Sequence, residues 1–136
     1  LDLILKEIPQ SQQALSFGVE EHTIISWGSA KGPILDAIDM LKKEGISIGY
    51  VQLKLMNPFP AEYVASLLKD AKIIIDIEAN HSGQLGKLFK QNVSRDIDYF
   101  ILKYSGRAMT STEVYDSLKK IVEGKAEKRE VLMHGA

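Results

Sequence analysis

Short runs of β-branched and aromatic residues alternate along this chain with longer segments whose apolar residues recur at helical spacing. The short runs lie at 23–27, 46–53, 72–78 and 99–103. Each is followed by a segment with apolar residues three or four positions apart, which is typical of an amphipathic helix. Strands that alternate with helices imply right-handed crossovers. The sequence therefore predicts an α/β fold with a mainly parallel sheet and helices on both faces.

Length and composition fit one domain. At 136 residues and 45% hydrophobic content, the chain is long enough for a single core and too short for two full domains. We expect this α/β domain to span residues 14–123. Residues 1–13 are expected to be the end of a preceding helix and a linker, and residues 124–136 a charged C-terminal tail. The leucine at position 1 indicates a piece cut from a longer polypeptide.

The charge balance and the residue inventory exclude several functional classes. Seventeen basic and eighteen acidic residues give a formal net charge of -1, so there is no field to attract nucleic acid or anionic lipid. The chain has no cysteine, which removes disulfides, zinc thiolates and Fe–S ligation. No apolar run approaches the roughly 20 residues of a membrane helix. We expect a cytoplasmic protein that binds neither nucleic acid nor membrane.

Ligands of open α/β sheets bind at the loops that follow the carboxyl ends of the strands. The first such loop contains Gly28, Ser29, Lys31 and Gly32. Its backbone amides and the Lys31 ammonium could hold an anion at the start of the next helix. However, the glycine spacing matches neither of the two common phosphate-binding motifs. The alternative is a tight turn in which Ser29 caps the helix.

The loop after the third run contains Glu78, Asn80, His81 and Gly83. A carboxylate and an imidazole close together could share acid and base chemistry. The sequence identifies no nucleophile or orienting group beside them, so helix capping or contact with another domain is the alternative. The three histidines are far apart and form no helical pair, so we do not expect a metal site.

The fourth loop combines an aromatic residue, a turn glycine and an arginine: Tyr104, Gly106 and Arg107. Aromatic residues and arginine often anchor protein interfaces. A solvated turn would also suit these residues. Interface and exposed turn therefore both stay open for this loop.

Taken in order, these loops resemble the C-terminal part of the α subunit of 2-oxoacid:ferredoxin oxidoreductases, which is related to the transketolase C-terminal domain. The resemblance extends over residues from about 14 to 123, nearly the whole chain. The matching stretches are Trp27-Gly28-Ser29-Ala30-Lys31-Gly32, Val51-Gln52-Leu53, Asn57-Pro58-Phe59-Pro60, Asp76-Ile77-Glu78-Ala79-Asn80, Gly83-Gln84-Leu85-Gly86 and Lys103-Tyr104-Ser105-Gly106-Arg107-Ala108-Met109. In the last stretch, Ser105 stands where the family has an acidic residue and Ala108 where it has proline.

The resemblance implies a three-layer α/β/α domain with a five-stranded sheet and one antiparallel edge strand around residues 14–17. The whole enzyme of this family oxidatively decarboxylates a 2-oxoacid to an acyl-CoA, using thiamine diphosphate, Mg²⁺, Fe–S clusters and ferredoxin. This chain lacks the motif for the diphosphate and the cysteines for a cluster. The resemblance therefore places the cofactors on other domains or subunits, and no catalytic, cofactor-binding or metal-binding residue is assigned here.

These observations favour a docking and assembly element. Its expected contacts to the rest of the α subunit or to the β subunit are Glu78, Asn80, His81, Tyr104 and Arg107. Two other hypotheses stay open. One is an independent domain that binds a phosphate or carboxylate ligand through Lys31 and the helix start near Gly83. The other is the equivalent domain of a transketolase or of a pyruvate dehydrogenase β chain.

Overall fold

The described residues form a domain built around one β-sheet. The computed structural model describes residues 9–27, 30–54, 59–79, 84–103 and 108–132. These residues form six strands in the spatial order β1-β3-β2-β4-β5-β6. The strands are β1 (Ala14–Ser16), β2 (His22–Trp27), β3 (Gly49–Leu53), β4 (Ile73–Glu78), β5 (Tyr99–Lys103) and β6 (Arg129–Leu132). All neighbouring strands are parallel except β1, which runs antiparallel to β3.

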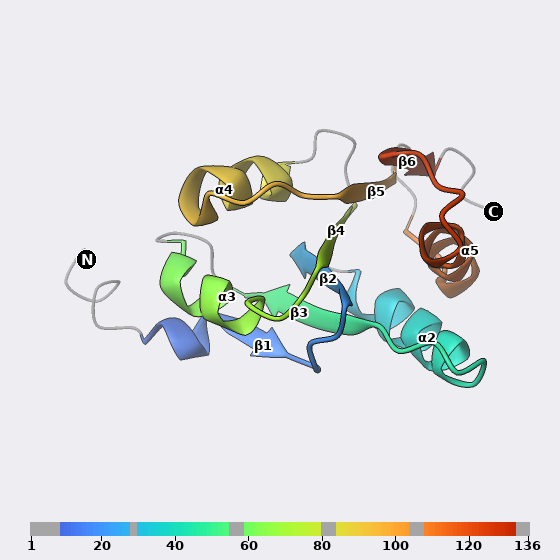
Figure 1. Cartoon of the computed structure of the whole chain (residues 1–136), viewed down its shortest axis with the longest axis horizontal. Coiled ribbons are helices and arrows are strands. Elements are labelled where there is room, and N and C mark those ends of the chain that lie inside the picture. Colours follow the sequence, from blue (N-terminus) through green and yellow to red (C-terminus); the bar gives the residue numbers. More distant parts are fainter. Residues whose placement is uncertain (1–8, 28–29, 55–58, 80–83, 104–107, 133–136) are drawn as a thin grey trace.

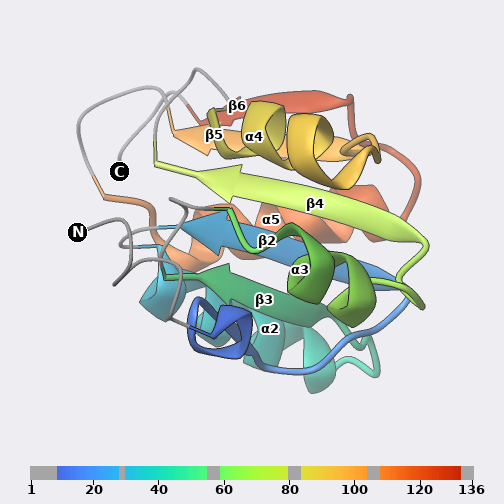
Figure 2. The same ribbon diagram turned by 90° about the vertical axis from the view of Figure 1, so that its left-hand side faces the viewer.

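Helices cover both faces of this sheet (Figure 1). One face carries α2 (Lys31–Lys42) and α5 (Ser111–Val122), and the other carries α3 (Ala61–Leu67) and α4 (Gln84–Val93). In the view of Figure 2, α3 and α4 lie in front of the strands and α2 and α5 behind them. A short 3-10 turn, η1 (Gln10–Gln12), precedes β1. The structure is therefore a three-layer α/β/α domain.

Two apolar clusters, one on each side of the sheet, form the core. Adjacent residues of a strand point to opposite faces, so Ile74 packs with α3 and α4 while Ile75 and Ile77 pack with α2 and α5. Ile74, Ile75 and Ile77 of β4 can be buried because this strand lies inside the sheet, between β2 and β5. This explains why the sequence reads there as a nearly continuous apolar run.

The structure confirms the α/β class, the parallel sheet and the antiparallel edge strand at the start of the domain. It corrects the expected number of strands, because the described residues form six strands where five were expected. The additional strand, β6, lies in the segment 124–136 that was predicted to be a charged tail. The charged residues of this segment hide the strand pattern in the sequence. In the structure, Arg129 lies over the Phe100 ring and Leu132 packs against the core.

Within the described part of the chain, no helix is long and apolar enough to cross a membrane. The helix end predicted at residues 1–8 lies outside the described residues. The limits of the domain at residues 14 and 123 stay a prediction, although the sheet itself continues to Leu132.

Candidate functional site

The parallel strands β2, β3, β4 and β5 end at the same edge of the sheet, where a ligand or partner would be met. Trp27, at the end of β2, is 46% exposed. Glu78 ends β4 and Lys103 ends β5. Several predicted site residues lie outside the described residues and stay predictions. They are Gly28, Ser29, Asn80, His81, Gly83, Tyr104, Gly106 and Arg107.

Glu78 points into the protein toward the first turn of α4. Its side chain is buried, and its two carboxylate oxygens accept hydrogen bonds from the backbone amides of Leu85, at 3.0 Å, and Gly86, at 3.3 Å. The first amides of a helix have no partner within the helix, and they attract negative charge. Glu78 therefore occupies the place at which a helix start would hold an anionic ligand. Its predicted interface contact remains untested.

Asp76 lies two residues before Glu78 on the same face of β4 and is fully buried. Neither of its carboxylate oxygens has a hydrogen-bond partner among the described residues. Burial raises the pKa of Asp76 well above its usual value, and the Glu78 carboxyl raises it further. The amide of Gly86 and the guanidinium of Arg129 act in the opposite direction. Asp76 thus favours its protonated form over a wider pH range than an exposed aspartate does.

Gly86 allows α4 to approach these two acids closely. A Cβ atom at this position would lie 2.5 Å from Cε1 of Phe100 and 2.9 Å from Oδ2 of Asp76. No side chain larger than hydrogen fits without displacing one of them. Asp76 and Gly86 belong to the stretches that carry the resemblance, but no site role was predicted for either, although an acid inside an isoleucine run is a signal for a buried, unusual carboxyl group.

Lys103, at the end of β5, is fully buried and faces the start of α5. Its ammonium lies 2.7 Å from Oε2 and 2.9 Å from Oε1 of Glu113. The same glutamate forms the predicted capping box with Thr110, which is confirmed. Burial alone would raise the pKa of Glu113, but the Lys103 ammonium and the Thr110 donors outweigh it and lower that pKa. The buried cation is thus neutralised within the domain.

The first loop is described only at its end. The N-cap position of α2 falls on Ala30, which makes no side-chain cap hydrogen bond. Ser29 lies outside the described residues, so its predicted cap stays a prediction. The ammonium of Lys31 lies 5.2 Å from the ring centroid of Phe17, beside the β1 edge of the sheet. A Cβ atom at Gly32 would meet nothing within 4 Å, so packing does not require glycine there.

Among the residues that the structure describes, none form a site for the cofactors of the resembled family. Across the described ranges, no three histidine, cysteine, aspartate or glutamate side chains come together as a metal site. The sequence contains no cysteine for an Fe–S cluster. The carboxylate of Glu78 already faces backbone amides of α4. We therefore assign no step of thiamine or Fe–S chemistry to this chain.

Comparison with known proteins identifies the family of the chain. Residues 21–114 match the family described as pyruvate:ferredoxin oxidoreductase core domain II. The 2-oxoacid:ferredoxin oxidoreductase subunit alpha of Saccharolobus solfataricus is 40% identical over 133 residues, which cover 96% of this chain and 21% of that subunit. The chain therefore spans about a fifth of the length of this relative.

Solved structures share the fold. The alpha chain of a probable 2-oxoacid ferredoxin oxidoreductase from Thermoplasma acidophilum is 43% identical, with a TM-score of 0.58 over 83% of this chain and 99% of that chain. A split-gene transketolase is 19% identical, with a TM-score of 0.65 over 83% of this chain and 42% of that chain, and shows the fold alone. The resemblance seen in the four loops is confirmed: the chain belongs to the pyruvate:ferredoxin oxidoreductase core domain II family and is similar to part of the α subunit of 2-oxoacid:ferredoxin oxidoreductases.

Proposed function

We propose that this chain is a non-catalytic assembly domain of the α subunit of a cytoplasmic 2-oxoacid:ferredoxin oxidoreductase. The whole enzyme would decarboxylate a 2-oxoacid oxidatively to an acyl-CoA and reduce ferredoxin. Thiamine diphosphate, Mg²⁺ and Fe–S clusters would be held by other domains of the α subunit or by the β subunit. Similarity to a fifth of a longer α subunit supports this division of labour.

The observation that carries the proposal is that two helix starts at the carboxyl edge of the sheet already hold carboxylates of this chain. Glu78 accepts hydrogen bonds from two amides of α4, and Glu113 closes the capping box of α5. An anionic ligand would have to displace these side chains from donors that they already satisfy. The arrangement favours recognition of protein over recognition of a phosphate or carboxylate ligand.

A thermal-shift series tests the choice between assembly and ligand binding. A ligand present at 100 times its dissociation constant stabilises a folded protein by about 2.7 kcal/mol. We expect no shift in the melting temperature of the purified chain with thiamine diphosphate and Mg²⁺, with CoA or with ATP. A concentration-dependent stabilisation by any of these compounds would favour the ligand-binding alternative.

Arg107→Ala, in the fourth loop, tests the interface itself in the intact enzyme. We expect less β subunit to co-purify with the α subunit, while the complex that still forms keeps its rate of 2-oxoacid decarboxylation. Lys120→Ala, which removes an exposed positive charge near the end of α5, is the matched control. Unchanged subunit association with a lower rate of decarboxylation would contradict the proposal.

A further inference from the structure

One edge of the sheet is incompletely covered by its helices. Successive side chains of β1 alternate between the faces, so Ala14 is buried with the α3 and α4 cluster, whereas Leu15 and Phe17 are 39% and 40% exposed. Phe17 stacks on Tyr50, with ring centroids 5.3 Å apart, and Tyr50 belongs to the cluster beneath α2. Two large apolar side chains therefore lie open beside α2.

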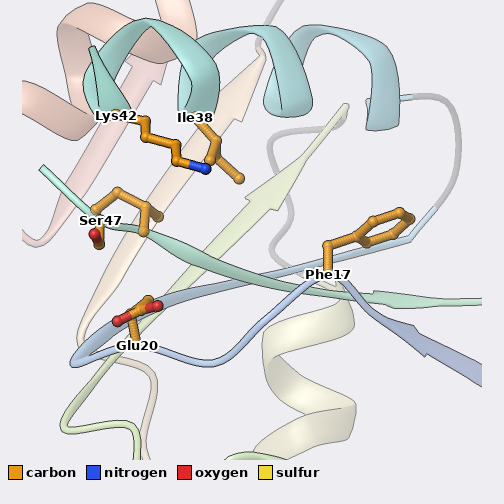
Figure 3. Close-up of a pocket in the computed structure, with 6 residues that line it drawn as sticks. Phe17, Glu20, Ile38, Lys42 and Ser47 are labelled. Carbon is orange, nitrogen blue, oxygen red and sulfur yellow. The ribbon is translucent and has the colours of Figure 1, made fainter.

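A shallow pocket of about 160 Å³ lies next to Phe17 (Figure 3). Ile38 and Lys42 of α2 form one wall, Ser47 and Ile48 precede β3, and Glu20 lies on the connection between β1 and β2. Small-molecule sites usually enclose about 300 to 1,000 Å³. This pocket is too small for a cofactor, and its size and its isoleucines suit a single apolar side chain.

Positive charge dominates the border of this surface. The Lys31 ammonium lies over the Phe17 ring, and Lys42 lines the pocket. Among the described residues, neither lysine forms an ion pair. Glu20 brings one carboxylate to the opposite wall. Two ammonium groups that form no ion pair among the described residues, beside a pocket lined in part by Phe17 and two isoleucines, complement a carboxylate next to an apolar side chain.

We propose that this surface, the β1 patch formed by Leu15, Phe17, Lys31, Ile38 and Lys42, is the docking site for another segment of the same α subunit. That segment inserts one apolar side chain into the pocket and places a carboxylate against the two lysines. The inference rests on the proposed function, because the relatives' α subunits contain the additional polypeptide that such a segment requires. A symmetric contact between this patch and the same patch of a second copy is disfavoured, since it would bring lysines against lysines.

Site-specific photo-crosslinking in the intact α subunit tests this docking. A benzoyl-phenylalanine is placed in turn at position 17 in the β1 patch, at position 27 at the carboxyl edge, and at position 131 on β6. Val131 is 36% exposed and serves as the matched control on the opposite edge of the sheet. We expect position 17 to crosslink to an acidic peptide outside this domain but within the same subunit, and position 131 to give no such product.

A charge reversal tests the electrostatic part of the proposal. Lys42→Glu should lower the crosslink yield from position 17 by roughly threefold, as expected for the loss of an exposed ion pair. Lys69→Glu makes the same charge change on an exposed residue just after α3 and should leave the yield unchanged. Equal yields in the two variants would overturn the assignment of a carboxylate to this surface.

The outcomes separate this inference from the proposed function. Crosslinks from position 27 to the rest of the enzyme without crosslinks from position 17 would overturn the β1 patch and leave the assembly role standing. A crosslink from position 17 to a second copy, recognised by mixing isotope-labelled and unlabelled subunits, would also overturn it. Absence of crosslinks from both positions would overturn both proposals.

Discussion

The β4–α4 and β5–α5 junctions each end a strand on an ionisable residue that faces the start of the next helix, yet they distribute charge differently. After β4, the strand supplies the carboxylate: Glu78 binds the amides of Leu85 and Gly86. After β5, the strand supplies the cation, Lys103, and the carboxylate comes from Glu113 in the helix itself.

At both junctions a carboxylate accepts at least one hydrogen bond from a backbone amide at the start of a helix. At one junction a cation lies beside that carboxylate, and at the other a second acid does. The β5–α5 junction pairs one buried ammonium with one carboxylate. The β4–α4 junction brings a second acid, Asp76, beside Glu78, and neither oxygen of Asp76 has a hydrogen-bond partner among the described residues. We therefore expect the first junction to depend on its ion pair and the second on close packing and pH.

Glu113→Ala is expected to have the largest effect. It leaves the fully buried Lys103 without this carboxylate and removes half of the capping box. The free energy of unfolding, measured by urea denaturation, should fall by about 3 kcal/mol, because the buried Lys103 ammonium loses the carboxylate of a largely buried ion pair. Glu113→Gln keeps a hydrogen-bond acceptor and should lose less. A loss no larger than that of Glu62→Ala, an exposed acid in the first turn of α3, would contradict the account.

Gly86→Ala tests the close packing of the β4–α4 junction. The new methyl group would lie 2.5 Å from Phe100 and 2.9 Å from Asp76. Overpacking of this kind should lower the free energy of unfolding by about 2 kcal/mol. Gly32→Ala in α2 is the control, because its methyl group would meet nothing within 4 Å and a helix gains up to about 1 kcal/mol from this exchange. Equal effects of the two substitutions would rule out the steric explanation.

The two junctions also show what the sequence could predict. The capping box at Thr110 and Glu113 was predictable because both residues belong to one helix turn, where spacing fixes geometry. The pairing of Glu113 with Lys103 was not, since it depends on how α5 returns over β5. The same holds for Glu78, whose role as a partner of the α4 amides depends on where that helix begins.

Strand prediction failed for a related reason. The inner strands were recognised because both of their faces are buried, so that nearly every residue is apolar. No residue of the edge strand β6 is fully buried. The strand carries Arg129 and Glu130 beside only two apolar residues. Its pairing with β5 is a tertiary contact that residues 124–136 alone do not encode, so the segment was interpreted as a tail.

Asp76→Asn tests the pH dependence of the β4–α4 junction. The folded-state pKa of Asp76 is raised, so between the unfolded and folded pKa values the folded state binds the proton that the unfolded state releases. The stability of the wild type should therefore fall as pH rises above about 4 and through the folded pKa of Asp76. Asparagine does not titrate, so the variant should become more stable relative to the wild type as the pH rises.

Urea denaturation of both proteins at pH 5 and pH 8 measures this effect. We expect the stability difference to shift in favour of Asp76→Asn by about 1.4 kcal/mol for each pH unit between 5 and 8 that lies below the folded pKa of Asp76. Glu113→Gln should show no comparable shift over this interval, because the lowered pKa of Glu113 keeps that carboxyl ionised at both pH values. A difference that is constant with pH would mean that Asp76 ionises alike in the folded and unfolded states.

The smallest expected effect is that of Thr110→Ala. The hydroxyl oxygen of Thr110 accepts a hydrogen bond of 3.1 Å from the backbone amide of Glu113. The loss of this hydrogen bond should lower the free energy of unfolding by somewhat less than about 1 kcal/mol. Thr110→Ser keeps the hydroxyl and should stay close to the wild type. In a double-mutant cycle with Glu113→Gln, the two losses should not add, because both residues belong to one hydrogen-bonded network. Additive losses would mean that the capping box and the Lys103–Glu113 ion pair stabilise α5 independently of each other. The β5–α5 junction would then not be one hydrogen-bonded network.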